Sequence, residues 1–498
     1  MKNRIFSFLL IWAWLAFAPQ SFAQKPPKVP SKIGDALILE FKPPFDRMTI
    51  DTDESVLSDR ENVLILVGTN TKILDAKGKP LATEAIRAGM KTEIKLEPGL
   101  DLTNLIASQI KVKTNPENKA VEVKGYLDKV SDEEAFVDGK TVLLVPNAVI
   151  VGGSEWKNKS FSSFKDIPLG SVLDLKGTRR ENGKIHATGG QVKPNLITPL
   201  EKQLIQLVQK GLVLPPPDKP GAGVQIGGQT FKVVENLELN TYVTKVGYKV
   251  IPRYLKNLQD GDPNKILFRF YVLEDDTPNA VAFPDGSVFI NTGLLRKLDN
   301  EAQLALILGH EIAHVSVEHP RRTLETAQKQ AFWMGLAGAV AGAALGQQYG
   351  GLIGQIGFGL LSNKFSRDME DQADRIGLFY TYDAGYDIRE STKIWRKLIG
   401  ENYRDNSVGV FLYSDHPSLK SRLRNTKREL VTNYRNADFS EVIDGREKYM
   451  ETVGVFFGWV KPKLKPIVPT PQPVESPTIK PKTKAKPKVN RPKVKKRP

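Results

Sequence analysis

The pattern of apolar and polar residues divides the chain into two kinds of region. From about Asp35 to Lys193, short alternating apolar runs are separated by Gly, Asn and Asp, which is typical of β-strands joined by turns. From about Val234 to Val455 the pattern favours helices, apart from residues 265–295, which predict strands and a hairpin. We therefore expect an all-β N-terminal region followed by a mainly helical α+β region.

The β-rich region contains an internal repeat. Residues 62–96 align with residues 141–177, because both run through a strand, an Asn, a second strand, a Gly/Lys turn, a segment able to form a helix, a Gly and a further strand. This spacing predicts tandem small barrel-like modules, and the second module resembles small OB-like barrels. The sequence leaves open whether they bind a polymer, dock a partner, shield the rest of the chain or act as spacers.

Segments rich in Pro and Gly mark the predicted boundaries. The clearest are QKPPKVPS at 24–31 and LPPPDKPGAGVQIGGQ at 214–229. The predicted segments are, in chain order, a signal peptide at 1–23, a linker at 24–34, β modules at 35–117 and 118–195, a helix with a linker at 196–233, a helical domain at 234–455 and a tail at 461–498.

The first residues have the pattern of a secretory signal peptide. Lys2 and Arg4 precede an uncharged apolar stretch at 5–18, and the small residues Ser21 and Ala23 have the spacing of a cleavage site. The apolar stretch is short for a membrane anchor, which is the alternative interpretation. We therefore expect export to the periplasm, with or without peripheral contact to a membrane. The chain contains no cysteine, so its stability does not rest on disulfides.

The positive charge of the chain is concentrated at its C-terminal end. The formal net charge is +16, of which +12 lies in residues 461–498 and +2 in Lys2 and Arg4. Ten prolines alternate with lysines in that tail, so we expect an extended, disordered arm without a core. Such an arm is expected to bind anionic envelope polymers or lipid head groups weakly. Nucleic acid is not expected as a partner, because the chain is expected to be exported.

The stretch GHEIAHVSVEHP at 309–320 holds three of the five histidines of the chain. Asp299 or Asn300 can cap a predicted helix here, and Gln303, three residues after Asn300, suits a capping box. His310 and His314 are four residues apart on that helix, so both rings project from one face. Two such imidazoles can bind one zinc ion. Glu311 lies about 100° further round the helix, where a general base can take a proton from a water molecule activated by the metal. The alternative is a buried helix with two structural histidines.

The stretch FSRDMEDQADRIG at 365–377 supplies a candidate third ligand. Glu370 and Asp374 are four residues apart on one face of a second predicted helix. Glu370 can be the carboxylate ligand, and Asp374 can hold the second nitrogen of a zinc-bound histidine. A solvated acidic helix face is the alternative. His319 is expected to point away from the metal, because it lies about 180° from His310 if the helix continues.

Four stretches together resemble the M48 family of zinc metalloendopeptidases. They are NAVAFPDGSVFINTGLL, LILGHEIAHVSVEH, SRDMEDQADRIG and SDHPSLKSR, in the order and rough spacing of that family. The resemblance is greatest to its soluble exported branch. It implies a gluzincin-type metalloprotease domain at 234–455 and one zinc ion per chain, bound by His310, His314 and Glu370. It also implies that Glu311 is the general base and that Asp374 supports a zinc ligand.

The resemblance extends to the substrate. NAVAFPDGSVF resembles the edge strand over the active site, to which an extended peptide adds as a further strand. Asn279 and Ala280 are therefore expected beside the scissile bond. One departure is visible, since the exported branch often has a glutamate where this chain has Gln372.

Two further segments carry expectations about regulation. His416, with Arg422 six residues later, matches a late motif of the exported branch, although Asp415 replaces the usual threonine. The resemblance therefore places His416 and Arg422 among the expected catalytic residues. His416 is expected to assist the oxyanion or to bind zinc as a fourth ligand that blocks water; a loop histidine is the alternative. Residues 331–361 are apolar and rich in Gly and Ala, which favours a buried or lid-like helical hairpin over peripheral membrane contact.

The sequence therefore predicts an exported zinc-dependent endopeptidase with N-terminal β modules. Misfolded or misassembled cell-envelope proteins are the expected substrates, by family analogy. The alternative function is an envelope adaptor or chaperone-like protein, in which the β modules and the tail bind partners and the zinc domain is latent.

Overall fold

The computed structural model describes residues 29–461, with gaps. The gaps are 53–56, 58–61, 100–101, 115–118, 132, 181–182, 198–200, 203–204, 207, 210–211, 216–220, 227–228, 324–325, 327–364 and 401–418. The predicted signal peptide, the apolar segment at 331–361 and His416 lie outside the described residues, as does the tail beyond residue 461. The expectations about them stay predictions.

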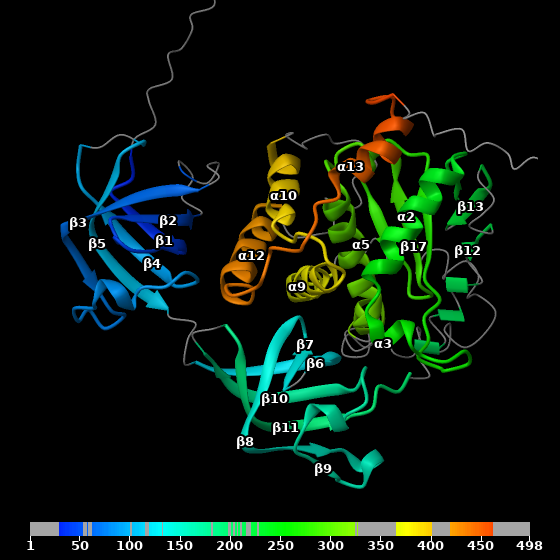
Figure 1. The fold of residues 1–498 in the computed structure, drawn as a ribbon, viewed down its shortest axis with the longest axis horizontal. Coiled ribbons are helices and arrows are strands. Elements are labelled where there is room, and N and C mark those ends of the chain that lie inside the picture. Colours follow the sequence, from blue (N-terminus) through cyan, green and yellow to red (C-terminus); the bar gives the residue numbers. More distant parts are fainter. Residues whose placement is uncertain are drawn as a thin grey trace, which may run out of the picture. The chain divides into compact units, whose positions relative to one another are not determined.

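The first β module is a closed five-stranded barrel (Figure 1). Its strands follow one another round the barrel in the order β1-β2-β3-β5-β4. Alternate side chains point inward along each strand and bury apolar residues such as Ile38, Ile50 and Ile110. The strands are β1 (Lys32–Phe41), β2 (Arg47–Thr52), β3 (Val63–Leu74), β4 (Lys91–Leu96) and β5 (Leu105–Thr114).

The second β module repeats this topology with one added short strand, β9. The strand order is β11-β10-β6-β7-β8-β9, and β11 also pairs in parallel with β8, which closes the same ring of five. The strands are β6 (Ala120–Ser131), β7 (Glu134–Val137), β8 (Lys140–Gly152), β9 (Ser160–Phe161), β10 (Val172–Arg179) and β11 (Ile185–Lys193).

The internal repeat is therefore visible in the topology. The two aligned segments contain β3 and β4 in the first barrel and β8 and β10 in the second, and each pair is separated by 3-10 turns. One detail differs from the prediction. The Asn expected between two strands lies inside a single long strand, where Asn147 has a φ of 66°. This left-handed residue lies close to the register shift between β8 and β11 and bends the strand there.

The segment predicted as a linker contains a small sheet. Strands β12 (Leu212–Val213), β13 (Gly223–Ile226) and β14 (Gln229–Lys232) pair in the order β12-β13-β14. Val224 is buried there with Tyr271 and Phe289 of the following domain. Apolar packing of this kind makes the segment part of the following domain rather than a free connection.

The C-terminal region packs helices against a three-stranded sheet (Figure 1). The sheet order is β15-β17-β16, with β16 at an edge. Its strands are β15 (Arg269–Leu273), β16 (Ala280–Ala282) and β17 (Ser287–Asn291). The helices are α2 (Leu237–Val250), α3 (Arg253–Lys256), α4 (Thr292–Leu295), α5 (Glu301–Ser316), α9 (Arg367–Asp383), α10 (Glu390–Gly400), α12 (Leu419–Thr432) and α13 (Arg446–Tyr449), with a π-helical turn at Met450–Gly454.

Helix α5 is the centre of this region, and every one of its residues is buried. The cap predicted for it is confirmed, because the Asn300 side chain accepts a hydrogen bond from the Gln303 amide at 2.9 Å. The Gln303 side chain in turn accepts from the Asp299 amide at 2.8 Å. The polar groups on α5 are therefore enclosed by protein and not exposed to solvent.

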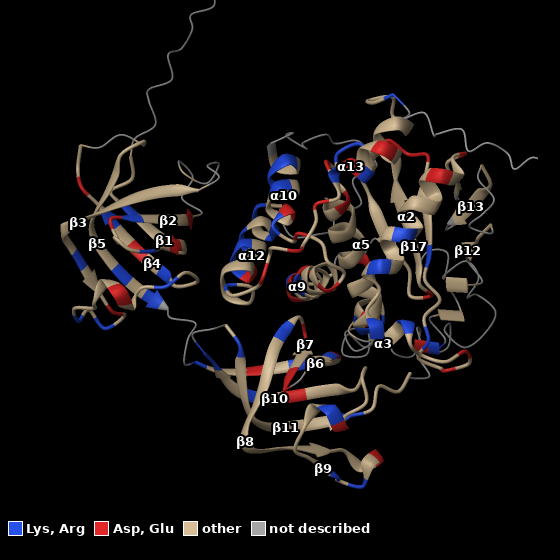
Figure 2. Cartoon of the chain, in the orientation of Figure 1, with Lys and Arg blue, Asp and Glu red and all other residues tan. Residues whose placement is uncertain are grey.

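The charged residues of the described chain are mixed in sign. Figure 2 shows Lys and Arg interspersed with Asp and Glu along the strands and helices. This agrees with the sequence count, which leaves little net charge outside the tail and the first residues. Among the described residues, no helix is both long enough and apolar enough to cross a bilayer.

The second barrel contacts helix α9 through a buried interface. The ring of Phe136 stacks on Phe379, with 4.8 Å between the centroids. Close by, the Tyr380 hydroxyl donates to Asp128 Oδ1 at 3.1 Å. Burial raises the pKa of Asp128 well above its ordinary value, and the hydrogen bond from Tyr380 offsets only part of this rise. The interface therefore contains a carboxyl group whose ionisation opposes folding.

Replacing Asp128 by Asn is expected to change how stability depends on pH. A folded-state pKa above the unfolded value of about 3.9 means that the folded protein holds this proton longer. Stability is therefore lost as pH rises through the folded pKa. Asp128→Asn should be more stable than the wild type by a margin that widens from pH 5 to pH 8, measured by thermal unfolding. Asp174→Asn, at an accessible site of the same barrel, is the matched control. A margin independent of pH would contradict the assignment.

Candidate metal centre

Two histidines on α5 face each other across one turn of the helix. The Nε2 atoms of His310 and His314 are 3.0 Å apart, and both rings are buried. The four-residue spacing places them on the same side. The structure therefore brings together the pair that the sequence singles out.

Helix α9 brings a carboxylate to the same point. Its first turn is capped by Ser366, which accepts from the Met369 amide. Glu370 lies one turn further on and is fully buried, with Oε2 at 3.5 Å from His310 Nε2 and Oε1 at 3.6 Å from His314 Nε2. The three ligand atoms lie within 4.8 Å of one another.

The close approach of α5 and α9 depends on two facing glycines. A Cβ added to Gly377 would lie 2.8 Å from the His310 nitrogen, and one added to Gly309 would lie 2.9 Å from Thr381 Oγ1. Any larger residue at either position would push the helices apart and draw Glu370 away from the histidines. This glycine pair was not predicted from the sequence, although Gly309 directly precedes the histidine motif.

The three groups fit one zinc ion. Tetrahedral bonds of 2.0–2.1 Å place neighbouring ligand atoms about 3.3 Å apart, and the distances here are 3.0, 3.5 and 3.6 Å. Two neutral imidazoles and one carboxylate are also a donor set that catalytic zinc sites use, with a fourth position left for water or substrate. The geometry therefore fits one metal ion, as the sequence predicts.

Asp374 and Arg422 form a second layer behind His310. Asp374 Oδ1 lies 2.9 Å from His310 Nδ1, while Arg422 binds both oxygens of Asp374 at 2.5 and 3.1 Å. Burial opposes ionisation of Asp374, but Arg422 and His310 outweigh it and lower the pKa of Asp374 below its ordinary value. The guanidinium also lies on the Trp395 ring at 3.9 Å. Arg422, predicted as a catalytic residue, is thus placed against Asp374 and His310.

Glu311 lies next to the triad and is held by the edge strand. Its Oε2 accepts a hydrogen bond from the Ala282 amide at 3.0 Å. Burial raises the pKa of Glu311 to about 8, and the neighbouring Glu370 carboxylate contributes to the rise. A carboxyl group with a pKa near neutrality can both take up and release a proton.

His319 does not point away from the metal site, contrary to the expectation for a continuous helix. Helix α5 ends at Ser316, and Glu318 adopts a left-handed conformation with a φ of 59°. The turn brings His319 Nδ1 to 2.9 Å from His314 Nδ1. Burial lowers the pKa of His319 to about 4, so its ring is neutral at neutral pH. No spacing rule reveals this contact, because it depends on the break in the helix.

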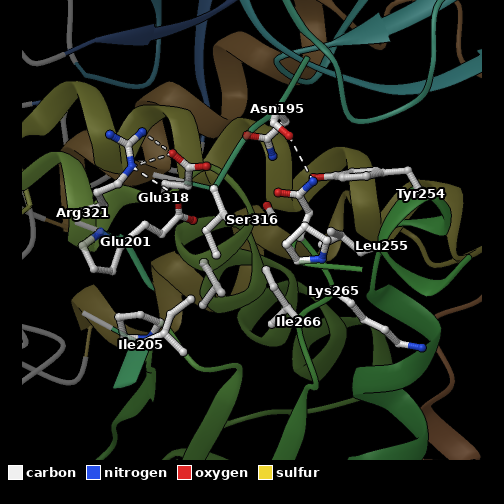
Figure 3. Close-up of a pocket in the computed structure, with 16 residues that line it drawn as sticks. Asn195, Glu201, Ile205, Tyr254, Leu255, Lys265, Ile266, Ser316, Glu318 and Arg321 are labelled. Carbon is white, nitrogen blue, oxygen red and sulfur yellow. Dashed lines mark hydrogen bonds and ion pairs between the residues drawn. The ribbon is translucent and has the colours of Figure 1, made fainter. Parts of the chain in front are cut away.

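Ion pairs hold this turn in place. Arg321 Nε donates to Glu318 Oε2 at 2.8 Å, and Arg321 also lies 3.8 Å from Glu201. Figure 3 shows this group beside Ser316, in a pocket that borders the end of α5.

The residues predicted to contact substrate lie on and beside β16. Ala280 begins the strand, and Asn279 precedes it. The side-chain oxygen of Asn279 is buried and has no hydrogen-bond partner among the described residues. His416 lies outside the described residues, so its role is not tested.

Part of this region matches a known protein family. Residues 240–430 match peptidase family M48, which confirms the resemblance seen in the four motifs. The chain is 27% identical over 221 residues to the beta-barrel assembly-enhancing protease of Escherichia coli and 33% identical over 196 residues to that of Yersinia pestis. It is 34% identical over 159 residues to the mitochondrial metalloendopeptidase OMA1 of Schizosaccharomyces pombe.

These similarities cover only part of each protein. The matched regions account for 40%, 38% and 32% of this chain, and for 45%, 38% and 45% of the three relatives. The matched region thus spans less than half the length of each of these three relatives. The family match, at residues 240–430, covers the helical region that contains His310, His314 and Glu370.

Proposed function

We propose that the chain is a zinc-dependent endopeptidase of gluzincin type. The observation that carries the proposal is the buried triad of His310, His314 and Glu370, whose ligand atoms are within 4.8 Å of one another. The match of residues 240–430 to an M48 peptidase supports it. When bound, zinc supplies a Lewis acid that polarises the peptide carbonyl and lowers the pKa of water.

Three residues around the triad have separate roles in this proposal. Glu311 accepts a proton from the attacking water and passes it to the leaving amine, for which its raised pKa suits it. Asp374 accepts from His310 Nδ1–H and so directs the Nε2 lone pair towards Glu370 and His314. Arg422 holds Asp374 ionised and in place.

The edge strand β16 supplies the substrate site in this proposal. A peptide in extended form adds to the edge of β16 that pairs with no other strand among the described residues, since main-chain hydrogen bonds do not depend on sequence. Asn279 directly precedes this strand and lies beside the proposed scissile bond, and its buried side-chain oxygen has no hydrogen-bond partner among the described residues. A site of this kind selects extended chain, so unfolded segments are better substrates than folded domains.

We further propose that the enzyme acts on misfolded or misassembled proteins of the cell envelope. Two of the relatives named above are beta-barrel assembly-enhancing proteases, and the N-terminal sequence predicts export. Zinc is the proposed cofactor, with one ion per chain.

The test is digestion of a denatured protein by the mature chain. Internal cleavage, identified by mass spectrometry of the products, is expected with zinc present. A chelator is expected to abolish it, and added zinc to restore it. Binding of denatured protein without cleavage, unchanged by the chelator, would instead support the adaptor function.

A further inference from the structure

A chain of buried polar contacts leads from the metal triad to the second barrel. It begins at His314 Nδ1, which lies 2.9 Å from His319 Nδ1. His319 Nε2 is 3.0 Å from Gln372 Oε1, and Gln372 Nε2 donates to Asp138 Oδ1 at 2.7 Å. Asp138 belongs to the turn between β7 and β8, far from the triad in sequence. The contacts thus run from one zinc ligand, through two neutral side chains, to a carboxylate of another module.

The outer end of this chain is fixed by charged groups. Asp138 Oδ2 accepts from Arg375 Nη2 at 2.7 Å and from Lys140 Nζ at 2.6 Å. At the next link, Arg322 Nη1 donates to Gln372 Oε1 at 2.9 Å. Arginine can only donate and a carboxylate can only accept. The Gln372 amide is therefore held with its oxygen towards His319 and its nitrogen towards Asp138.

The donor and the acceptor are then determined for both contacts of His319, with Gln372 and with His314. His319 Nε2 must donate to the Gln372 oxygen, so the Nδ1 atom of the neutral His319 ring is an acceptor. His314 Nδ1 must consequently carry the proton that His319 accepts. This leaves the lone pair of His314 on Nε2, which faces His310 Nε2 and Glu370 Oε1.

We propose that His319 and Gln372 are positioning residues that fix the tautomer of His314, and that the second barrel, through Asp138, completes the metal site. The inference rests on the proposed zinc triad. His310 has its carboxylate partner directly, in Asp374. For His314 the carboxylate is Asp138 of the second barrel, which His314 reaches through His319 and Gln372. Metal affinity therefore depends on how the barrel contacts α9.

Three variants separate this role from a merely structural one. Asp138→Asn removes the one acceptor that satisfies both Gln372 and Arg375, because an amide can offer its oxygen to only one of them. Gln372→Glu places two carboxylates in contact but still accepts from His319 and Arg322. When the two substitutions are combined, the amide introduced on the barrel donates to the carboxylate introduced on α9. The contact between positions 138 and 372 is then reversed relative to the native chain, and the contacts with His319, Arg322 and Arg375 keep their donors and acceptors.

The measurement is the zinc dissociation constant, from competition with a coloured chelator, beside the thermal unfolding of the metal-free chain. Asp138→Asn should weaken zinc binding by about 10-fold or more, the range seen for outer partners of metal ligands. Gln372→Glu alone should lower stability but keep zinc affinity near that of the wild type. The double variant should recover both.

Two controls keep the result decisive. Asp383→Asn removes another contact between the barrel and α9, the ion pair with Lys129, without touching the chain of contacts; its zinc affinity should be unchanged. His319→Leu removes the acceptor of His314 within the helical region itself and should weaken zinc binding as Asp138→Asn does. If zinc binds the wild type tightly, and binds His319→Leu and Asp138→Asn equally tightly, the inference is overturned. If the wild type binds no zinc, the proposed function fails instead.

Discussion

Glu311→Gln is expected to remove nearly all peptidase activity while zinc stays bound. The amide keeps an oxygen to accept from the Ala282 amide, so the local packing is preserved. It cannot take up a proton, and loss of a general base costs typically 10²–10⁴-fold in rate. Turnover of a denatured substrate by the zinc-loaded variant should therefore fall by at least about 100-fold.

The matched control lies on the same helix. Glu301 is also buried, and it accepts from the Tyr386 hydroxyl at 2.5 Å, away from the triad. Glu301→Gln should lose some stability but keep its turnover per folded molecule. Zinc content of both variants is measured alongside. Undiminished cleavage by Glu311→Gln would show that this glutamate is not the base.

Glu370→Ala is expected to have the largest effect on metal binding. Of the three ligands it is the only anionic one, and its removal leaves two neutral imidazoles to hold a divalent ion. Zinc affinity should fall by more than the 10–100-fold typical of an outer partner. Asp374→Asn changes the shared partner of His310 and Arg422 but no metal ligand, so its loss of zinc affinity should lie within that range.

Metal analysis after dialysis against a graded chelator series would rank these variants. The expected order of zinc retention is wild type, then Asp374→Asn, then Glu370→Ala. Full, tight zinc in Glu370→Ala would mean that the third ligand lies elsewhere in the chain. Thermal unfolding of the metal-free forms separates loss of affinity from loss of fold.

The spacing of residues within one helix was enough to predict the histidine pair of this site. The cap at Asn300 and the spacing of His310 and His314 are properties of one helix, and so they can be read from neighbouring residues. The presence of two related barrel-like modules was likewise indicated, since the repeat appears as two stretches of similar strand and turn spacing. Such features depend on few residues that are close in sequence.

The remaining contacts depend on where separate elements meet. His319 reaches His314 only because Glu318 takes a left-handed conformation, which nothing in the spacing of the histidines requires. Gly309 and Gly377 matter because α5 and α9 touch at these two points. The contact between the second barrel and Gln372 joins residues 234 positions apart. Tertiary packing decides all three, and a single sequence does not contain that information in a local form.

The attachment of Glu311 to β16 links the proposed general base to the register of the edge strand. Asn279 and Phe283 make main-chain hydrogen bonds to β17, so the alternate residues Ala280 and Ala282 direct their main-chain groups to the free edge. One of those groups, the Ala282 amide, is already taken by the glutamate. A peptide paired along this edge would take its register from the same strand that positions Glu311. The register of the paired backbones would therefore determine which peptide bond is cut, and side-chain preference would only refine that choice.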